Sequence, residues 1–164
     1  MLNKLLIISI SLLLVACDFT VSLSGKPEMM IDNRAVGVWE RIKHDGHKER
    51  LLILPLNDRE YFVSWPEGAN TELYARAHLF DFSGRTLVQL QWFGNSDGGV
   101  PDDNQVYQVA AYAITEKGLE IRMLNADVTG KDFQTAAELA KVIEVNADNP
   151  SLFREKMSYI KTGK

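Results

Sequence analysis

The feature that most constrains the fold is a series of short runs, rich in β-branched and aromatic residues, that begins at Val36. Turn-forming residues interrupt these runs about every ten residues, a pattern typical of β-strands joined by hairpins. The predicted strands span residues 36–43, 49–56, 60–65, 72–82, 86–93, 105–115 and 119–124. Because a meander leaves two open edges that invite aggregation, we expect the sheet to close into a barrel.

The turns and the alternation support this prediction. Asp45-Gly46 is a pair that supplies both positive-φ positions of a type I′ hairpin turn, and Ser83-Gly84 closes a later hairpin. Residues 72–82 alternate, so that Leu73, Ala75, Ala77 and Leu79 share one face and Tyr74, Arg76, His78 and Phe80 share the other. One of these faces should line the barrel.

The pattern changes to helical spacing near the C-terminal end of the chain. Apolar residues over 132–145 recur every three or four positions, with Asp132 or Thr135 as the N-cap, which predicts a helix that caps one mouth of the barrel. Residues 156–161 return to alternation and predict an eighth strand. The predicted fold class is therefore mainly β, with a single barrel domain over residues 36–164 and one helix.

The first sixteen residues are a separate segment. Lys4 precedes a largely apolar stretch of eleven residues, Leu5 to Val15, which is too short to span a bilayer and has the length of a signal peptide. The only cysteine of the chain, Cys17, follows this run directly. One cysteine forms no intramolecular disulfide and no cysteine-based zinc site, so a disulfide scaffold and a zinc finger are excluded.

The residues Leu14-Val15-Ala16-Cys17 resemble the lipobox of bacterial lipoproteins. This resemblance implies cleavage after residue 16, a thioether-linked diacylglycerol on Cys17 and an acylated amine, which together attach a protein stably to a membrane. The alternative is an ordinary secretory signal and a soluble protein with a free thiol. Asp18 matches the aspartate that in enteric lipoproteins marks retention in the inner membrane, which implies a periplasm-facing protein, with the outer membrane as the alternative.

Charge and composition limit the partners. Loss of residues 1–16 removes Lys4, so 17 basic and 22 acidic residues remain from the 18 and 22 of the full chain, a net charge of −5. Such a chain has no basic surface for nucleic acid. Residues 18–35 lack sustained periodicity, so residues 17–35 are predicted to be a lipidated N-terminus and a tether that holds the barrel away from the bilayer.

Gly37-Val38-Trp39, near the start of the first predicted strand, is similar to the Gly-x-Trp of lipocalin-like small barrels. The similarity supports the expected architecture and implies no particular ligand. An eight-stranded barrel encloses either packed side chains or a cavity for one small ligand.

Several side chains are candidates for chemistry. His78 and Arg76 with Trp92 are the candidate binding residues, and His78 with acids such as Asp81 is the basis of an alternative enzyme hypothesis. His44 and His47 flank a turn and are weak metal candidates, because two ligands alone do not form a closed site. Asp97, Asp102 and Asp103 are further weak metal candidates, because they belong to an oxygen-rich loop. This loop does not match the twelve-residue calcium-binding loop, so calcium binding is a minor hypothesis.

No assembled catalytic motif is found in the sequence. The leading hypothesis is therefore a non-enzymatic, membrane-anchored binding module in the envelope, without a cofactor, that recognises a protein partner or a small apolar ligand. An immunity or inhibitor protein is one form of it, since the mild acidity suits a basic partner. The alternatives are a structural subunit of an envelope complex and an enzyme with a cavity site around His78.

Overall fold

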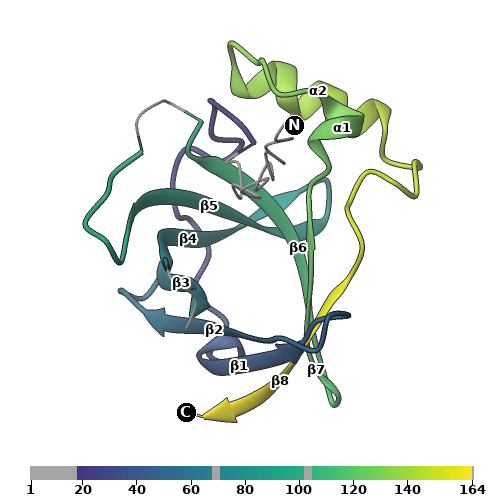
Figure 1. Ribbon diagram of the computed structural model, residues 1–164. Helices are drawn as coiled ribbons and strands as arrows, with labels where there is room; N and C mark the ends of the chain where they lie inside the picture. Colours follow the sequence, from purple (N-terminus) through teal and green to yellow (C-terminus); the bar gives the residue numbers. More distant parts are fainter. Residues whose placement is uncertain (1–17, 68–70, 102–104, 164) are drawn as a thin grey trace, which may run out of the picture.

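The computed structural model describes residues 18–67, 71–101 and 105–163, and in it eight antiparallel strands form one closed barrel (Figure 1). Each strand pairs with the next in the chain, and β1 pairs with β8 to close the ring, which confirms the predicted meander and barrel. The strands are β1 (Gly37–Ile42), β2 (Lys48–Pro55), β3 (Tyr61–Glu67), β4 (Leu73–Phe82), β5 (Arg85–Asn95), β6 (Tyr107–Thr115), β7 (Gly118–Met123) and β8 (Met157–Gly163).

Alternation decides which side chains point into the barrel. Leu51, Ala77 and Leu90 belong to the interior cluster, and every second residue along their strands shares this direction. The antiparallel order gives the barrel two ends. We call them the Ala35 end, where β1 begins and β2 ends, and the Glu49 end, where β1 ends and β2 begins.

A 3₁₀ helix, η1 (Asn33–Ala35), covers the Ala35 end. Trp39 is buried below it and donates its indole N–H to the carbonyl of Ala35 at 2.8 Å. The ammonium group of Lys161 on β8 lies 5.2 Å from the Trp39 ring centre, a cation–π contact across the closing pair of strands. Met29 and Ile31, which precede η1, also pack against the interior cluster.

The predicted helix forms, but the expectation that it caps a mouth of the barrel is wrong. It is α2 (Ala136–Val145), it starts at Thr135 with a reciprocal capping box to Glu138, and a short α1 (Ala126–Thr129) precedes it. Leu139 and Ile143 of α2 pack in a second cluster with outward-facing strand residues such as Phe80, Leu87 and Val109. The helix therefore covers the outer face of β4–β6, because long strands there present apolar residues on both faces.

The N-terminal segment differs from the predicted tether, because residues 18–35 pack on the barrel. Phe19 is completely buried, and its N–H and C=O exchange hydrogen bonds of 3.1 Å with the backbone of Tyr107. The backbone N–H groups of Leu23 and Ser24 donate to the side chain of the buried Gln89 on the outer face of β5. Apolar residues at 19, 21 and 23 are the reason, since all three contact the cluster under α2.

The first hairpin turn is also different from the prediction. Only Gly46 has a positive φ there, +81°, so Asp45 and Gly46 do not form a type I′ pair. Lys43 and His47 close a three-residue loop instead through a 2.9 Å backbone hydrogen bond. Ser83 and Gly84 do both have positive φ, as the two-residue turn between β4 and β5 requires.

Candidate functional site

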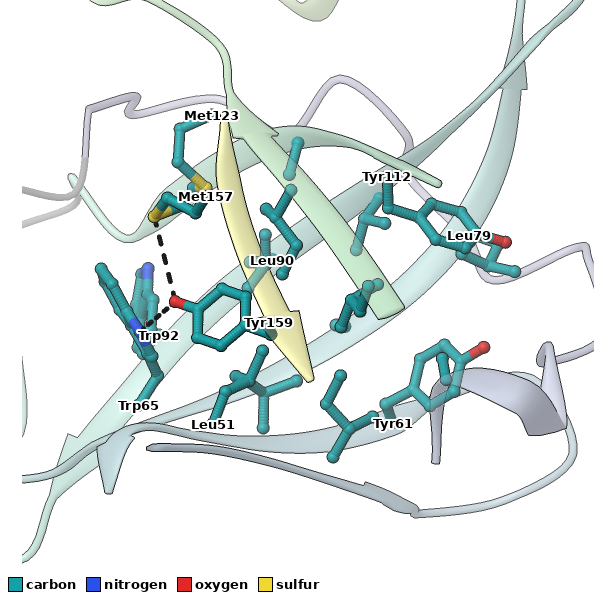
Figure 2. A pocket seen from close by; sticks show the side chains of 18 residues that line it. Leu51, Tyr61, Trp65, Leu79, Leu90, Trp92, Tyr112, Met123, Met157 and Tyr159 are labelled. Carbon is teal, nitrogen blue, oxygen red and sulfur yellow. Dashed lines mark hydrogen bonds between the residues drawn. The ribbon is translucent and has the colours of Figure 1, made fainter. Parts of the chain in front are cut away.

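The interior of the barrel contains an apolar cavity of about 90 Å³ (Figure 2). Its walls are the inward-facing side chains of the strands, together with Ala35 of η1. Since one water needs roughly 10–15 Å³, the space holds a small molecule, and its apolar walls offer water few partners. The side chains that Figure 2 labels around it are Leu51, Tyr61, Trp65, Leu79, Leu90, Trp92, Tyr112, Met123, Met157 and Tyr159.

The few polar atoms of this lining already have protein partners. At the Ala35 end, the Tyr61 hydroxyl accepts a 2.6 Å hydrogen bond from the backbone N–H of Asp32 and donates to the Asp32 carbonyl at 3.2 Å. Burial raises the pKa of Tyr61 to about 12, so the phenol stays neutral. The indole N–H of Trp92 donates to the side-chain oxygen of Gln108 at 3.0 Å. The cavity therefore selects ligands by shape and apolarity.

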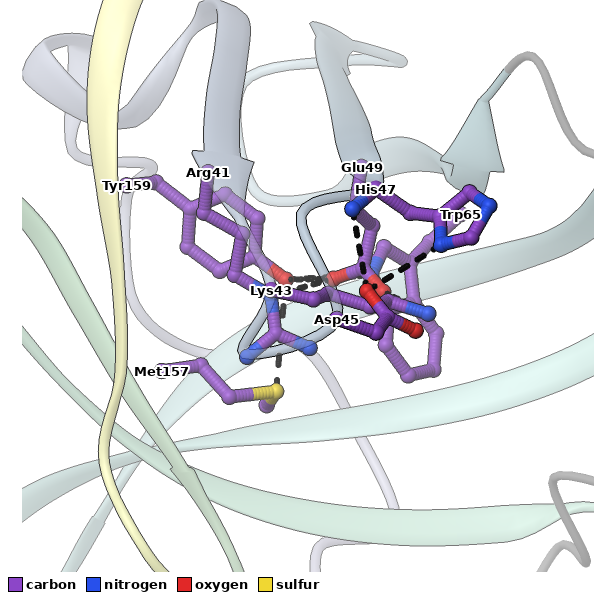
Figure 3. A network of polar contacts seen from close by, with 8 residues as sticks. All are labelled: Arg41, Lys43, Asp45, His47, Glu49, Trp65, Met157 and Tyr159. Atoms are coloured by element: carbon purple, nitrogen blue, oxygen red, sulfur yellow. Dashed lines mark hydrogen bonds and ion pairs between the residues drawn. The ribbon is translucent and has the colours of Figure 1, made fainter.

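A buried carboxylate, that of Glu49, lies toward the opposite end of the barrel at the centre of a polar network (Figure 3). Oε1 of Glu49 accepts hydrogen bonds from Arg41 Nε at 2.6 Å, from the Tyr159 hydroxyl at 2.6 Å and from the Trp65 indole N–H at 3.0 Å. Oε2 lies 3.2 Å from the ammonium nitrogen of Lys43. We call these five residues the Glu49 cluster. Trp65 and Tyr159 also line the cavity, so the cluster joins the apolar interior to the barrel rim.

The electrostatics of the Glu49 cluster follow from this geometry. Burial alone would raise the pKa of Glu49, but hydrogen bonds from Arg41, Tyr159 and Trp65 outweigh it, and the pKa falls below its ordinary value of 4.5. Burial and the neighbouring carboxylate raise the pKa of Tyr159. At neutral pH the cluster therefore holds one carboxylate, one guanidinium, one ammonium and a neutral phenol, with every oxygen of Glu49 in contact with a donor or a cation.

The sequence reasoning missed the Glu49 cluster, although a signal for it exists. Glu49 shares the two-residue alternation of Leu51 and Ile53, and Arg41 shares that of Trp39. Both charged side chains therefore had to point inward near a strand end. Arg41 and Glu49 are also direct register partners across β1 and β2, which a hairpin of the observed length dictates.

The three candidate binding residues separate in the structure. Trp92 points inward, is 4% exposed and lines the cavity. His78 and Arg76 lie on the outer face of β4, because Ala75, Ala77 and Leu79 between and beside them face inward. The cavity placement of His78 on which the enzyme hypothesis depended is therefore wrong.

His78 and Arg76 have other contacts on the outer face. Nε2 of His78 lies 3.1 Å from the Ser24 hydroxyl of the N-terminal segment, and burial lowers the pKa of His78. Arg76 forms an ion pair with Glu60, with 2.8 Å between Nη2 and the carboxylate. His78 thus joins β4 to the N-terminal segment, and Arg76 joins β4 to the residue that precedes β3.

The metal candidates are not brought together. His47 contacts Asp45 at 3.2 Å on the exposed hairpin, and the altered turn does not set His44 opposite His47. Asp97 accepts a hydrogen bond from Thr71, while Asp102 and Asp103 lie outside the described residues. Within residues 18–67, 71–101 and 105–163, no three histidine, cysteine or acidic residues gather in a way that could hold a metal ion.

Cys17 and the apolar run before it also lie outside the described residues. Asp18, the next residue, is 6% exposed, and its carboxylate lies 3.5 Å from the ammonium nitrogen of Lys131. In the part of the chain that the structure describes, no helix has the length and apolarity needed to cross a membrane.

Comparisons with known proteins add no relative to this description. A scan against models of protein families, a search of curated proteins and a search of solved structures all found no match.

Proposed function

We propose that this protein is a membrane-anchored, non-enzymatic binding module whose barrel cavity takes one small apolar molecule. The observation that carries the proposal is the cavity itself, which remains open between closely packed inward-facing side chains. Protein interiors are normally filled to the density of organic crystals, so an apolar space of about 90 Å³ is a departure that a ligand would correct. The size favours a single ring or a short branched chain over a long acyl chain.

The cavity predicts that small aromatic hydrocarbons stabilise the protein. Toluene and p-xylene should raise the free energy of unfolding, by about 2.7 kcal/mol when the free ligand reaches about one hundred times its dissociation constant. Trp65 and Trp92 line the cavity, so intrinsic fluorescence reports on binding and on urea unfolding in one experiment. Phenol is the comparison ligand, because its hydroxyl would enter an apolar space without a partner and should lower its affinity.

Two variants of β6 supply the control. Ala110→Leu places a larger side chain in the cavity, whereas Ala113→Leu adds the same atoms on the exposed outer face of the same strand. The first variant should lose stabilisation by toluene and the second should keep it. If both folded variants respond to toluene as the original protein does, the cavity is not the binding site and the proposal fails.

The anchor is proposed on the lipobox-like residues Leu14-Val15-Ala16-Cys17. We expect mass spectrometry of the membrane fraction to find acyl groups on Cys17 and a mature chain that starts there. A Cys17→Ser variant should leave the membrane fraction or accumulate as the uncleaved precursor. An unmodified soluble mature chain would contradict the anchor and leave the cavity proposal untouched.

A protein partner is the second candidate, and an outer aromatic patch favours it. The rings of Phe62, Tyr74 and Phe93 lie 5.6 to 6.5 Å apart on the outer face of β3, β4 and β5. Phe93 is 44% exposed, and the neighbouring Leu54 is 39% exposed. Clustered exposed aromatic residues are typical of interface anchors. This patch becomes the leading site if hydrocarbons fail to stabilise the protein.

A further inference from the structure

The structure leaves almost no free chain between residue 17 and the folded body. Asp18 is paired with Lys131, and Phe19 is wholly buried, is bonded to Tyr107 and has its ring 6.2 Å from that of Phe133. The hydroxyl of the next residue, Thr20, donates a 3.1 Å hydrogen bond to the carbonyl of Phe133 and fixes Thr20 as well. Because neighbouring Cα atoms are about 3.8 Å apart, a lipid on Cys17 would be attached within one residue of the barrel.

The point of attachment lies at the Glu49 end. Tyr107, which pairs with Phe19, is the first residue of β6, and the next residue, Gln108, points inward and accepts the hydrogen bond from Trp92. The ring of Trp92 lies 6.4 Å from that of Trp65, which belongs to the Glu49 cluster. An anchor at this position therefore holds the Glu49 end, and not the Ala35 end, close to the bilayer.

The same end carries a cationic surface cleft of about 520 Å³ between the end of β7 and the start of β8. Arg122, Arg154 and Lys156 line it, with Glu155 as its one acid. Lys156 contacts Glu120 at 2.7 Å, and the Arg154 guanidinium lies 3.9 Å from the Asp127 carboxylate, a weak ion pair. Arg122 and Arg154 are exposed hydrogen-bond donors. Glu155, Glu120 and Asp127 balance the three cations in number, but Arg122 is exposed and has no ion pair among the described residues, so its guanidinium is the group of the cleft that suits a phospholipid phosphate.

We infer that the Glu49 end of the barrel rests on phospholipid headgroups, held by the lipid on Cys17 and by the cleft of Arg122, Arg154 and Lys156. This inference rests on the proposed anchor, and it deepens the proposed function by naming the bilayer as the source of the ligand. The barrel end that holds the Glu49 cluster faces the membrane, where small apolar molecules concentrate. The Ala35 end, covered by η1, faces away.

The test uses the lipidated protein, purified from membranes and placed in vesicles of equal parts phosphatidylcholine and phosphatidylglycerol. Since the native thiol is blocked by the lipid, one introduced cysteine accepts a fluorophore selectively. Ser151→Cys places it in the cationic cleft, and Lys117→Cys places it on the β6–β7 hairpin at the Ala35 end. With lipids that carry a quencher at the headgroup, the label at 151 should lose most of its fluorescence and the label at 117 should keep it.

Charge reversal gives the matched control. Arg122→Glu, in the cleft, should reduce the loss of fluorescence at position 151, whereas Arg85→Glu, at the opposite end of the barrel, should leave it unchanged. Equal quenching at 151 and 117, stronger quenching at 117, or identical effects of the two reversals would overturn the inference. Absence of acyl groups on Cys17 would be a different result, because it contradicts the anchor itself.

Discussion

Gly118→Ala should cost the protein about 4 kcal/mol of stability or prevent folding. A Cβ atom on Gly118 would lie 1.9 Å from the backbone oxygen of Tyr159 and 3.1 Å from its carbonyl carbon, so the β7–β8 pair would have to separate. The φ of +138° is also a backbone region that is essentially reserved for glycine, at a cost of about 1–3 kcal/mol. Overpacking against backbone adds about 1–3 kcal/mol more.

Gly84→Ala is the matched control for this substitution. Gly84 also has a positive φ, +78°, but nothing lies within 4 Å of the place that a Cβ atom would take there, so only the conformational cost of about 1–2 kcal/mol applies. Urea unfolding followed by tryptophan fluorescence compares the two variants. Equal stability of Gly118→Ala and Gly84→Ala would show that β7 and β8 separate without a loss of stability, contrary to this prediction.

Glu49→Ala should cost about 3–5 kcal/mol, because it leaves the half-buried Arg41 guanidinium and two cavity-lining donors without their acceptor. Glu49→Gln keeps the volume and one acceptor oxygen for Arg41, Tyr159 and Trp65, but loses the charge and replaces the oxygen beside Lys43 with an NH2 group, so its loss of stability should be smaller than that of Glu49→Ala. The midpoints of urea unfolding at neutral pH measure both. If Glu49→Ala is as stable as the original protein, the Glu49 cluster contributes no stability.

The pH dependence separates the charge from the packing. The pKa of Glu49 is lowered by folding, so its contribution is fully present above its ordinary value of 4.5 and is lost as the pH falls through the lower pKa of the folded state. The original protein should therefore lose stability on acidification below pH 4.5. The Glu49→Gln variant should lack that part of the loss, and parallel pH curves for the two proteins would exclude the assigned role of the carboxylate.

The sequence predicted the barrel because strand alternation and hairpin turns are local signals. The alternation of β4 was predicted, and the structure selects Ala75, Ala77 and Leu79 as its inward face, which the sequence had left open. Thr135 caps the helix as one of the two proposed residues. The position of the helix relative to the barrel was harder to infer. The helix packs on an outer face because Phe80, Leu87 and Val109 are apolar on the side opposite the interior, and a single strand pattern does not say which of two apolar faces is enclosed.

The candidate site was predicted less well for the same reason. Of the three candidate binding residues, Trp92 lines the cavity. His78 and Arg76 were proposed because they are ionisable residues in the middle of a strand, and they lie on its outer face. The Glu49 cluster joins β1, β2, β3 and β8, and such a convergence depends on the closed ring. The N-terminal segment was interpreted as a tether because its apolar alternation, at residues 19, 21 and 23, is short and the segment pairs with the sheet through a single bridge.

Barrel closure sets an order of events during folding. Three residues of β1 pair with β8, namely Val38 with Gly163, Trp39 with Lys161 and Glu40 with Ile160. The strands that close the barrel are therefore separated by almost the whole sequence of the domain. Contacts of such sequence separation form late and slowly. A chain that emerges from a translocation channel with its N-terminus first would present β1 with an unpaired edge until β8 has also crossed. If the chain is exported and lipidated as proposed, we therefore expect chaperones of the receiving compartment to protect that edge, and the lipid to be in the membrane before the barrel is complete.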